Sequence, residues 1–198
     1  EIGYNWQSGN MTGYTGTDDN HTTINLPFTF PYYGNSYNTL TITTNGLINL
    51  GSTATMGSAC CSGQSLPNTE VGAAIAPFWE DFNYPIGGIS YGSSTESDGF
   101  IVQYAGVYHY SGGVQVWWQL VLYPDGNFDI VADNLVTDGG THTIGWNSPD
   151  GSEGTMLCYG SHCAYDNVSW RVYGGQSVSI VYGCTNSSAC NYDTAATD

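Results

Sequence analysis

The segment spanning residues 115–132, QVWWQLVLYPDGNFDIVA, restricts the fold more than any other part of the chain. Large apolar residues occupy alternate positions on both sides of Pro124-Asp125-Gly126, which is typical of strands with one buried face. Proline favours the first turn position, and glycine favours the left-handed position that closes a three-residue loop. This loop length places three apolar pairs opposite one another: Leu122 with Phe128, Leu120 with Ile130, and Trp118 with Ala132. A two-residue loop would break that register, so the segment predicts an antiparallel hairpin with a one-sided core.

A second hairpin is predicted over residues 40–50, LTITTNGLINL, by the same reasoning. A loop of Thr44-Asn45-Gly46 pairs two sets of apolar residues, Ile42 with Ile48 and Leu40 with Leu50. Residues 24–30, INLPFTF, also read as a strand, and Pro27 assigns that strand to a sheet edge or a bulge.

Further strands are expected in 100–110, 143–146, 155–158, 168–173 and 178–182, with long loops in 51–70 and 85–98. No stretch of 12 or more residues has a helical period. Short strands separated by regular turn signals favour an all-β fold, namely an antiparallel, jelly-roll-like β-sandwich with long loops.

The composition divides the chain into three parts. Residues 1–22 are polar and glycine-rich and are interpreted as an extended N-terminal arm, residues 23–182 as the sandwich domain, and residues 183–198 as a short cysteine-containing tail or linker module. No basic region followed by an apolar one opens the chain, so we expect a mature form or a piece of a longer protein. The sequence contains no run of 18 apolar residues, so no membrane-spanning segment is predicted.

The charge excludes one class of partner. The sequence has 17 acidic residues, a single arginine, Arg171, and no lysine, which gives a net charge of −16. Nucleic-acid binding requires clustered cations that displace counterions, so this class is excluded, and anionic membranes are unfavourable partners for the same reason. Such a charge suits a cation-rich external medium.

Cysteines and sequons point to the cell exterior. The six cysteines form no CxxC zinc pattern, and their even number favours disulfides in an oxidising compartment. Proximity in sequence favours Cys158–Cys163 and Cys184–Cys190, whereas Cys60 and Cys61 either bond to each other or reach different partners. Four N-x-S/T sequons lie in turn-rich sequence and are candidate glycosylation sites: Asn10, Asn20, Asn167 and Asn186. Together these features predict an extracellular or cell-surface location.

Calcium is the expected cofactor if the chain has one, because hard cations take carboxylate and amide oxygens. The candidate ligands are the acidic residues in turn-like sequence: Asp18, Asp19, Asp150, Glu153 and Asp193. Solvated turns are the alternative interpretation of these residues. The four histidines, His21, His109, His142 and His162, have no metal-ligand spacing and are interpreted as ordinary surface or strand residues.

Catalytic motifs are missing from the sequence, which has no GxSxG, no HExxH and no phosphate-binding loop. A glycoside hydrolase would need two facing carboxylates. Glu80 and Asp81 are adjacent and would point to opposite faces of a strand, so Glu70 or Glu153 would have to supply the partner. A glycan-binding module is a further alternative, with Trp117 and Tyr123 as stacking or interface residues on the sheet face opposite Trp118. That strip could equally be covered by a loop, by the arm or by another subunit.

Four segments in order carry a family resemblance: LPFTFPYYGNSYNTLTITTNGLINLG, IAPFWEDF, VWWQLVLYPDGNFDIVADN and HTIGWNSPDGSEGTMLCY. Residues 24–182 resemble a β-sandwich module of large secreted microbial surface proteins and, more distantly, the NIDO domain of nidogen-type matrix proteins. The resemblance implies an extracellular, non-catalytic module. The tail GCTNSSACNYDTAATD resembles a cysteine-containing repeat of marine secreted proteins, which implies that the chain continues past Asp198 and that Cys184 or Cys190 pairs with a residue beyond it.

The sequence therefore favours a structural or adhesive role, as a subunit or repeat of a surface fibre or matrix assembly. The expected partners are copies of the chain or other surface proteins, with glycans as a further possibility. The arm of residues 1–22 is expected to reach a neighbouring molecule and add to its open sheet edge. The alternatives are a lectin-like module and a glycoside hydrolase.

Overall fold

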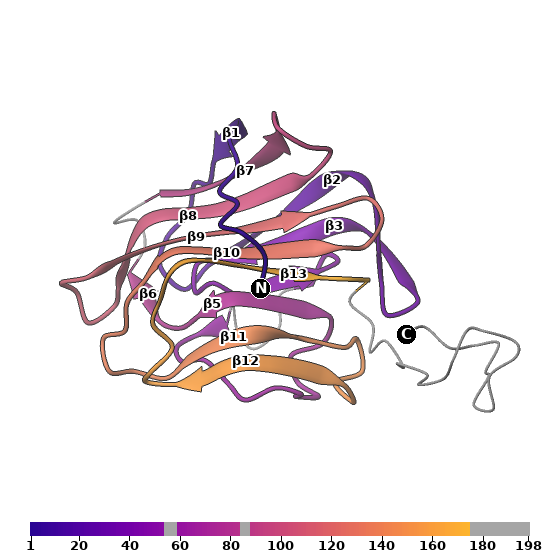
Figure 1. The fold of residues 1–198 in the computed structure, drawn as a ribbon. Helices are drawn as coiled ribbons and strands as arrows, with labels where there is room; N and C mark the ends of the chain where they lie inside the picture. Colours follow the sequence, from indigo (N-terminus) through magenta and orange to yellow (C-terminus); the bar gives the residue numbers. More distant parts are fainter. Residues whose placement is uncertain (54–58, 84–87, 175–198) are drawn as a thin grey trace, which may run out of the picture.

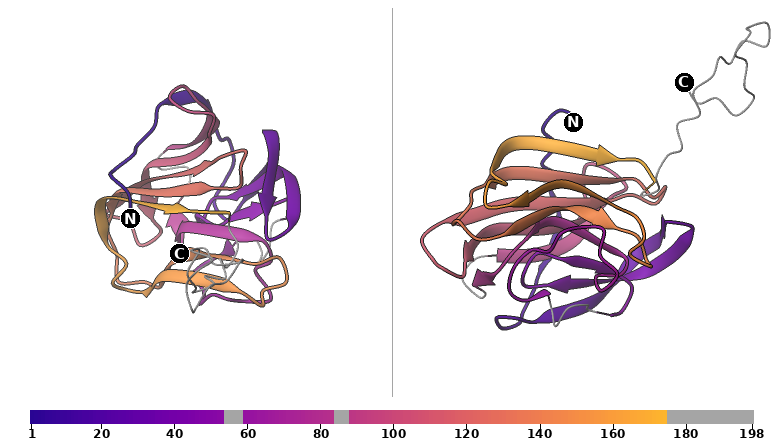
Figure 2. Two further views of the ribbon diagram at one scale, coloured as in Figure 1. Left: turned by 45° about the vertical axis from the view of Figure 1, so that its right-hand side comes forward. Right: turned by 90° about the horizontal axis from the view of Figure 1, so that it is seen from below.

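A computed structural model describes residues 1–53, 59–83 and 88–174. Two antiparallel sheets pack face to face, as the ribbon in Figure 1 and the view from below in Figure 2 show. The predicted all-β sandwich is therefore confirmed. Most of the large apolar side chains of the two sheets lie in one core between them.

The first sheet has seven strands, and β6 (Phe82–Asn83) pairs with β8 beside the main path. The other six follow in spatial order: β1 (Gly9–Gly13), β7 (Gly88–Ser94), β8 (Phe100–His109), β9 (Gln115–Leu122), β10 (Phe128–Leu135) and β13 (Tyr165–Val172). The second sheet has six strands in the order β12 (Gly154–Gly160), β11 (His142–Asn147), β5 (Ala74–Trp79), β4 (Ile48–Leu50), β3 (Asn35–Thr43) and β2 (His21–Tyr32).

Both predicted hairpins form in the predicted register. In β9–β10 all three apolar pairs lie opposite one another, and Gly126 has a φ of 88° and donates its N–H to the Tyr123 carbonyl at 3.0 Å. In β3–β4, Gly46 has a φ of 80° and the apolar pairs again match. Pro27 lies in β2, at the edge of the second sheet, where the register shifts between Asn25 and Phe30. Its strand is thus both an edge and a bulged one, as the missing N–H requires.

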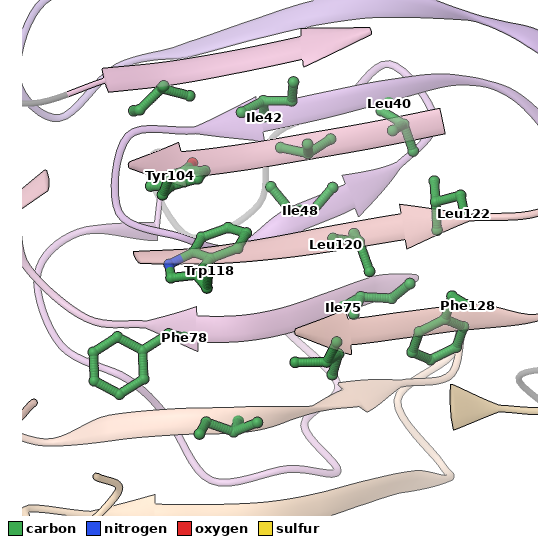
Figure 3. Close-up of a cluster of buried hydrophobic side chains, with 14 of the residues drawn as sticks. Leu40, Ile42, Ile48, Ile75, Phe78, Tyr104, Trp118, Leu120, Leu122 and Phe128 are labelled. Carbon is green, nitrogen blue, oxygen red and sulfur yellow. The ribbon is translucent and has the colours of Figure 1, made fainter. Parts of the chain in front are cut away.

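The one-sided faces of the hairpins meet in the core. Figure 3 shows Leu120, Leu122 and Phe128 facing Leu40 and Ile48 of the other sheet. Toward the other end of the core, the Tyr104 and Trp118 rings stack with centroids 3.9 Å apart. Each fully buried aliphatic side chain contributes about 1.5–3 kcal/mol, so this core is the main stabilising term of the fold.

Two expectations are corrected by the structure. Residues 85–98 are not only loop, because β7 lies within them; its sequence GISYGSS has little apolar pattern and is held by backbone pairing between β1 and β8. Residues 1–22 do not extend away, because β1 pairs with β7 of the same chain. The expected strand 178–182 and the tail 183–198, with Cys184, Asn186, Cys190 and Asp193, lie outside the described residues.

Candidate functional site

Four ionisable side chains from both sheets meet at one end of the sandwich. Glu80 follows β5, His109 ends β8, His142 begins β11, and Asp138 lies in the connection from β10 to β11. One ligand atom from each lies within 4.8 Å of the others. Both histidine side chains are fully buried and that of Glu80 is only 4% exposed, whereas Asp138 lies at an exposed position, with its side chain 15% exposed. We call these four residues the His–carboxylate cluster.

A β-bulge directs His109 into this cluster. Along β8, the residues that face the core are first Phe100, Val102 and Tyr104, all at even positions. The register with β9 shifts between Ala105 and Val107, and Gly106 has a φ of 75°. After the shift, odd positions face inward, so Val107 and then His109 are buried. The bulge therefore re-aims a side chain that simple alternation would place on the outer face.

The 44–46 hairpin loop holds Glu80 in position. The Asn45 carbonyl accepts the N–H of Glu80 at 3.1 Å, and its side-chain oxygen accepts the N–H of Phe82 at 3.0 Å. Gly46 lies so close to β5 that an added Cβ would be 2.2 Å from the Phe78 carbonyl oxygen. The predicted turn glycine thus also provides the close approach that places Glu80.

Three members of the cluster, His109, His142 and Asp138, are each oriented by a second contact. His109 Nε2 lies 3.0 Å from the Val136 carbonyl oxygen and His142 Nδ1 lies 3.3 Å from the Gly160 carbonyl oxygen. Asp138 accepts a hydrogen bond from the Ser111 hydroxyl at 2.7 Å and one from the N–H of Gly140 at 2.8 Å. The remaining imidazole nitrogens are therefore turned toward the carboxylates.

Within the cluster, His109 Nδ1 lies 2.5 Å from Glu80 Oε1, and His142 Nε2 lies 3.5 Å from Asp138 Oδ1. Burial raises the pKa of Glu80 to about 7, although His109 opposes that shift. Burial lowers the pKa of His142. Burial acts in the same direction on His109, but the Glu80 and Asp138 carboxylates and the Val136 carbonyl together outweigh it, and the pKa of His109 is raised.

Aromatic rings enclose the imidazole side of the cluster, and a cleft opens on its carboxylate side. Phe78 stacks on His142 with ring centroids 4.9 Å apart, and Phe82 lies 5.8 Å from His109. A cleft of about 230 Å³ is lined by residues that include Glu80 and Asp138 but neither histidine of the cluster. The imidazole nitrogens are therefore shielded from solvent, whereas the carboxylates border a cleft that solvent can enter.

The sequence interpretation of His109 and His142 as ordinary residues missed this cluster. The only local signals are Asp138 and His142 spaced four residues apart and Glu80 directly after a wholly apolar strand. His21 and His162 lie at exposed positions, as expected for surface residues.

The expected calcium ligands within the described residues lie in two separate places. Asp19 lies beside Cys60 and Cys61, near the cluster, since Asp18 and Asp19 both raise the pKa of Asp81. Asp150 and Glu153 lie in the turn after Asn147, at the opposite end of β11 from His142. A six-residue strand separates these ends by roughly 17 Å, so no single ion contacts both groups. One Asp150 oxygen already accepts hydrogen bonds from Ser148 and Ser152.

The N-terminal segment covers the outer face of the first sheet. Figure 1 shows its indigo trace crossing the sheet from β1 toward β13. Gln7 and Gln119 exchange two hydrogen bonds, from the Gln7 N–H to Gln119 Oε1 at 2.9 Å and from Gln119 Nε2 to the Gln7 carbonyl at 2.8 Å. The Ile2 N–H donates to the Ser169 carbonyl at 2.9 Å. We call residues 2–8 the clasp. The N-terminal arm therefore forms hydrogen bonds with the first sheet of its own chain, and not with the sheet of a neighbouring molecule as the sequence led us to expect.

A charged network lies at the end of the clasp. Arg171 donates to both oxygens of the buried Asp129 carboxylate at 2.7 Å, which raises the pKa of the guanidinium. Asp129 also accepts from the Tyr123 hydroxyl at 2.9 Å, and that hydroxyl accepts from Gln7 at 2.8 Å. Tyr123 is 9% exposed, so it is not an open stacking surface, and Trp117 is half-buried.

Glycosidase-like opposition of carboxylates is not found for the predicted partners. Glu70 bonds through its N–H to Asn68, which in turn contacts Asn147, and Glu153 lies in the turn after Asn147. Both are thus at the opposite end of β11 from Glu80, and the groups that face Glu80 are His109, His142 and Asp138.

The cysteines and sequons within the described residues have definite positions. Cys158 and Cys163 form the predicted disulfide, with Cα atoms 5.6 Å apart, and Cys60 and Cys61 are bonded to each other. Asn10 and Asn167 are exposed, whereas Asn20 is half-buried and its Nδ2 donates to Thr17 at 3.2 Å.

Comparison with known proteins gives one match. A family model described as NIDO related matches residues 4–171. No curated protein and no solved structure matches the chain. In the described residues, no helix is long and apolar enough to cross a membrane. Domains related to NIDO are typically extracellular and of a non-enzymatic type. Since the match spans most of the 198 residues, including residues 4–8 of the clasp and all four members of the His–carboxylate cluster, the chain belongs to the NIDO-related family.

Proposed function

We propose that the chain is a non-catalytic structural or adhesive module of the cell exterior, acting as a subunit or repeat of a surface fibre or matrix assembly. Family membership supports the extracellular setting and the non-catalytic character. The clasp supports it as well, because it uses the N-terminal segment to close the face of the first sheet rather than to leave it open to a small ligand.

The observation that carries the proposal is the edge strand β12. It ends the second sheet, so one side of its backbone is unpaired within the sheet. Met156 and Tyr159 on this strand are 41% and 39% exposed. An edge strand with exposed apolar side chains favours association by strand addition, whereas β2 at the other edge of the sheet exposes mainly polar residues and proline.

Sedimentation velocity and electron microscopy of the purified chain test the proposal. We expect concentration-dependent oligomers or filaments, favoured by added salt because a net charge of −16 repels copies at long range. The double substitution Met156→Lys/Tyr159→Lys should abolish association, and Asn25→Lys on the exposed edge of β2 should leave it intact. A strictly monomeric wild-type chain at high concentration would contradict the proposed self-association.

Glycan binding is the second candidate, on the strength of one observation. A polar depression of about 530 Å³ lies beside Tyr123 and is lined by amide, carboxylate and guanidinium groups, among them Asn5, Asp98 and Arg171. Such groups suit sugar hydroxyls. A glycan array would support this function through specific binding that Asp98→Ala weakens, and an array with no specific signal would exclude it for the glycans tested.

A further inference from the structure

We propose that the His–carboxylate cluster is a binding site for one divalent first-row transition-metal ion, with Zn²⁺ as the reference ion, that joins the two sheets at this end of the sandwich. The proposal goes beyond the assembly function, because it concerns the interior of a single chain. Its four ligands are Glu80, which follows β5 of the second sheet, His142 of β11 in the same sheet, His109 of the first sheet, and Asp138 of the connection from β10 to β11.

The unsatisfied atoms of the cluster indicate a missing cation. A backbone carbonyl only accepts hydrogen bonds, so His109 donates from Nε2 to Val136 and His142 donates from Nδ1 to Gly160. This leaves lone pairs on His109 Nδ1 and His142 Nε2, facing the carboxylates. Those two nitrogens and Glu80 Oε1 are buried; when both imidazoles are neutral and Glu80 is ionised, no hydrogen joins the 2.5 Å contact between His109 Nδ1 and Glu80 Oε1, and none of the three atoms forms a hydrogen bond. Buried polar atoms rarely lack a hydrogen-bond partner. Lone pairs that face one another repel unless a cation lies between them.

The distances agree with a metal centre. Four ligands at about 2.1 Å from a tetrahedral ion lie about 3.4 Å from one another. The nitrogen-to-oxygen distances in the cluster run from 2.5 Å to 4.0 Å, which brackets that value. Changes of less than 1 Å bring these nitrogen-to-oxygen distances to that value.

The donor set selects the class of ion. Two imidazoles and two carboxylates suit Zn²⁺, Mn²⁺ or Fe²⁺, whereas Ca²⁺ takes oxygen ligands only. The supporting contacts have the pattern of a metal site: each imidazole donates its other N–H to a carbonyl, and Asp138 is fixed by Ser111 and Gly140. The cleft on the carboxylate side provides a route for the ion and room for a water ligand.

Metal titration of the tag-free full chain, stripped with a chelator, tests the site. We expect calorimetry to give one Zn²⁺ per chain with a raised melting temperature, and Co²⁺ to give the visible absorption of a nitrogen- and oxygen-ligated ion. His142→Ala should weaken Zn²⁺ binding by at least about 100-fold, and Ser111→Ala, which only frees Asp138, by about 10-fold. The control is His162→Ala, which removes an exposed imidazole and should change nothing.

Ser111→Ala keeps the test valid if His142→Ala does not fold, since Ser111 is an exposed hydroxyl whose loss leaves the core unchanged. The proposal is overturned if the folded wild-type chain takes up neither Zn²⁺ nor Co²⁺, which would make the cluster a proton-bridged ion pair. It is equally overturned if only Ca²⁺ binds, or if the Ser111 variant and every folded cluster variant bind Zn²⁺ as the wild type does, which would place the ion elsewhere.

Discussion

Two glycines decide which side chains reach the interior at the end of the sandwich. Gly46 lets the 44–46 loop approach the backbone of β5, and Gly106 forms the bulge that turns His109 inward. The role of Gly46 in a turn is predictable, because its loop is local and flanked by alternating apolar residues. The bulge at Gly106 is not, because it depends on pairing with β9, so alternation alone assigns His109 to the wrong face.

Gly46→Ala should destabilise the fold by roughly 3 kcal/mol. The left-handed backbone costs about 1–2 kcal/mol for a residue with a Cβ, and the clash with the Phe78 carbonyl forces β5 to shift at a further cost of similar size. Urea unfolding measures the difference. Gly34→Ala is the matched control, since its φ of 73° is similar but no atom lies within 4 Å of the added Cβ. Equal losses for both variants would show that the contact with β5 contributes nothing.

At the scale of elements, local pairing is predictable and distant pairing is not. The hairpins β3–β4 and β9–β10 follow from residues that are neighbours in sequence, and their registers are confirmed. β1 pairs with β7, some 80 residues away, and neither strand has the apolar alternation from which a strand could be predicted. The His–carboxylate cluster gathers the ends of β8 and β11, the residue after β5 and the connection between β10 and β11, so the four-residue spacing of Asp138 and His142 alone does not reveal it.

The Arg171–Asp129 pair should stabilise the packing of β13 and the clasp on β10. Arg171→Met leaves the Asp129 carboxylate buried without its bidentate partner, and we expect a loss of about 3 kcal/mol, at the low end for a broken buried pair because the arginine side chain is 32% exposed. Asp129→Asn combined with Arg171→Met should recover part of that loss. Equilibrium unfolding of the two single variants and the double variant gives the coupling energy, and additive effects would argue against a direct interaction.

At the scale of the whole molecule, the sandwich has one core, and a disulfide and the hydrogen bonds of the clasp stabilise its periphery. The Cys158–Cys163 disulfide joins β12 to the turn before β13 and therefore links an edge strand of one sheet to the last described strand of the other. The short separation made this pair predictable from sequence. The packing of the clasp on the first sheet was not predictable, because a polar, glycine-rich segment has the same composition whether it extends into solvent or lies along its own sheet.

The double substitution Cys158→Ser/Cys163→Ser should lower the free energy of unfolding by about 2 kcal/mol, the value for a loop this short. Thermal unfolding of the double variant against the wild type under non-reducing conditions measures the loss. Reducing agent should bring the wild type to the melting temperature of the variant, provided that the other four cysteines contribute little; a larger drop for the wild type would assign a structural role to a disulfide among them.

The Arg171–Asp129 ion pair under the clasp also determines how susceptible the folded chain is to trypsin. Trypsin cuts after lysine or arginine, and the whole sequence offers it one such residue, Arg171. That residue lies within β13, and its guanidinium is held by Asp129. Folded protein should therefore resist trypsin, and when the strand detaches, digestion should yield two fragments of fixed size. The rate at which a single band becomes two on a gel would then report directly how often this side of the sandwich opens.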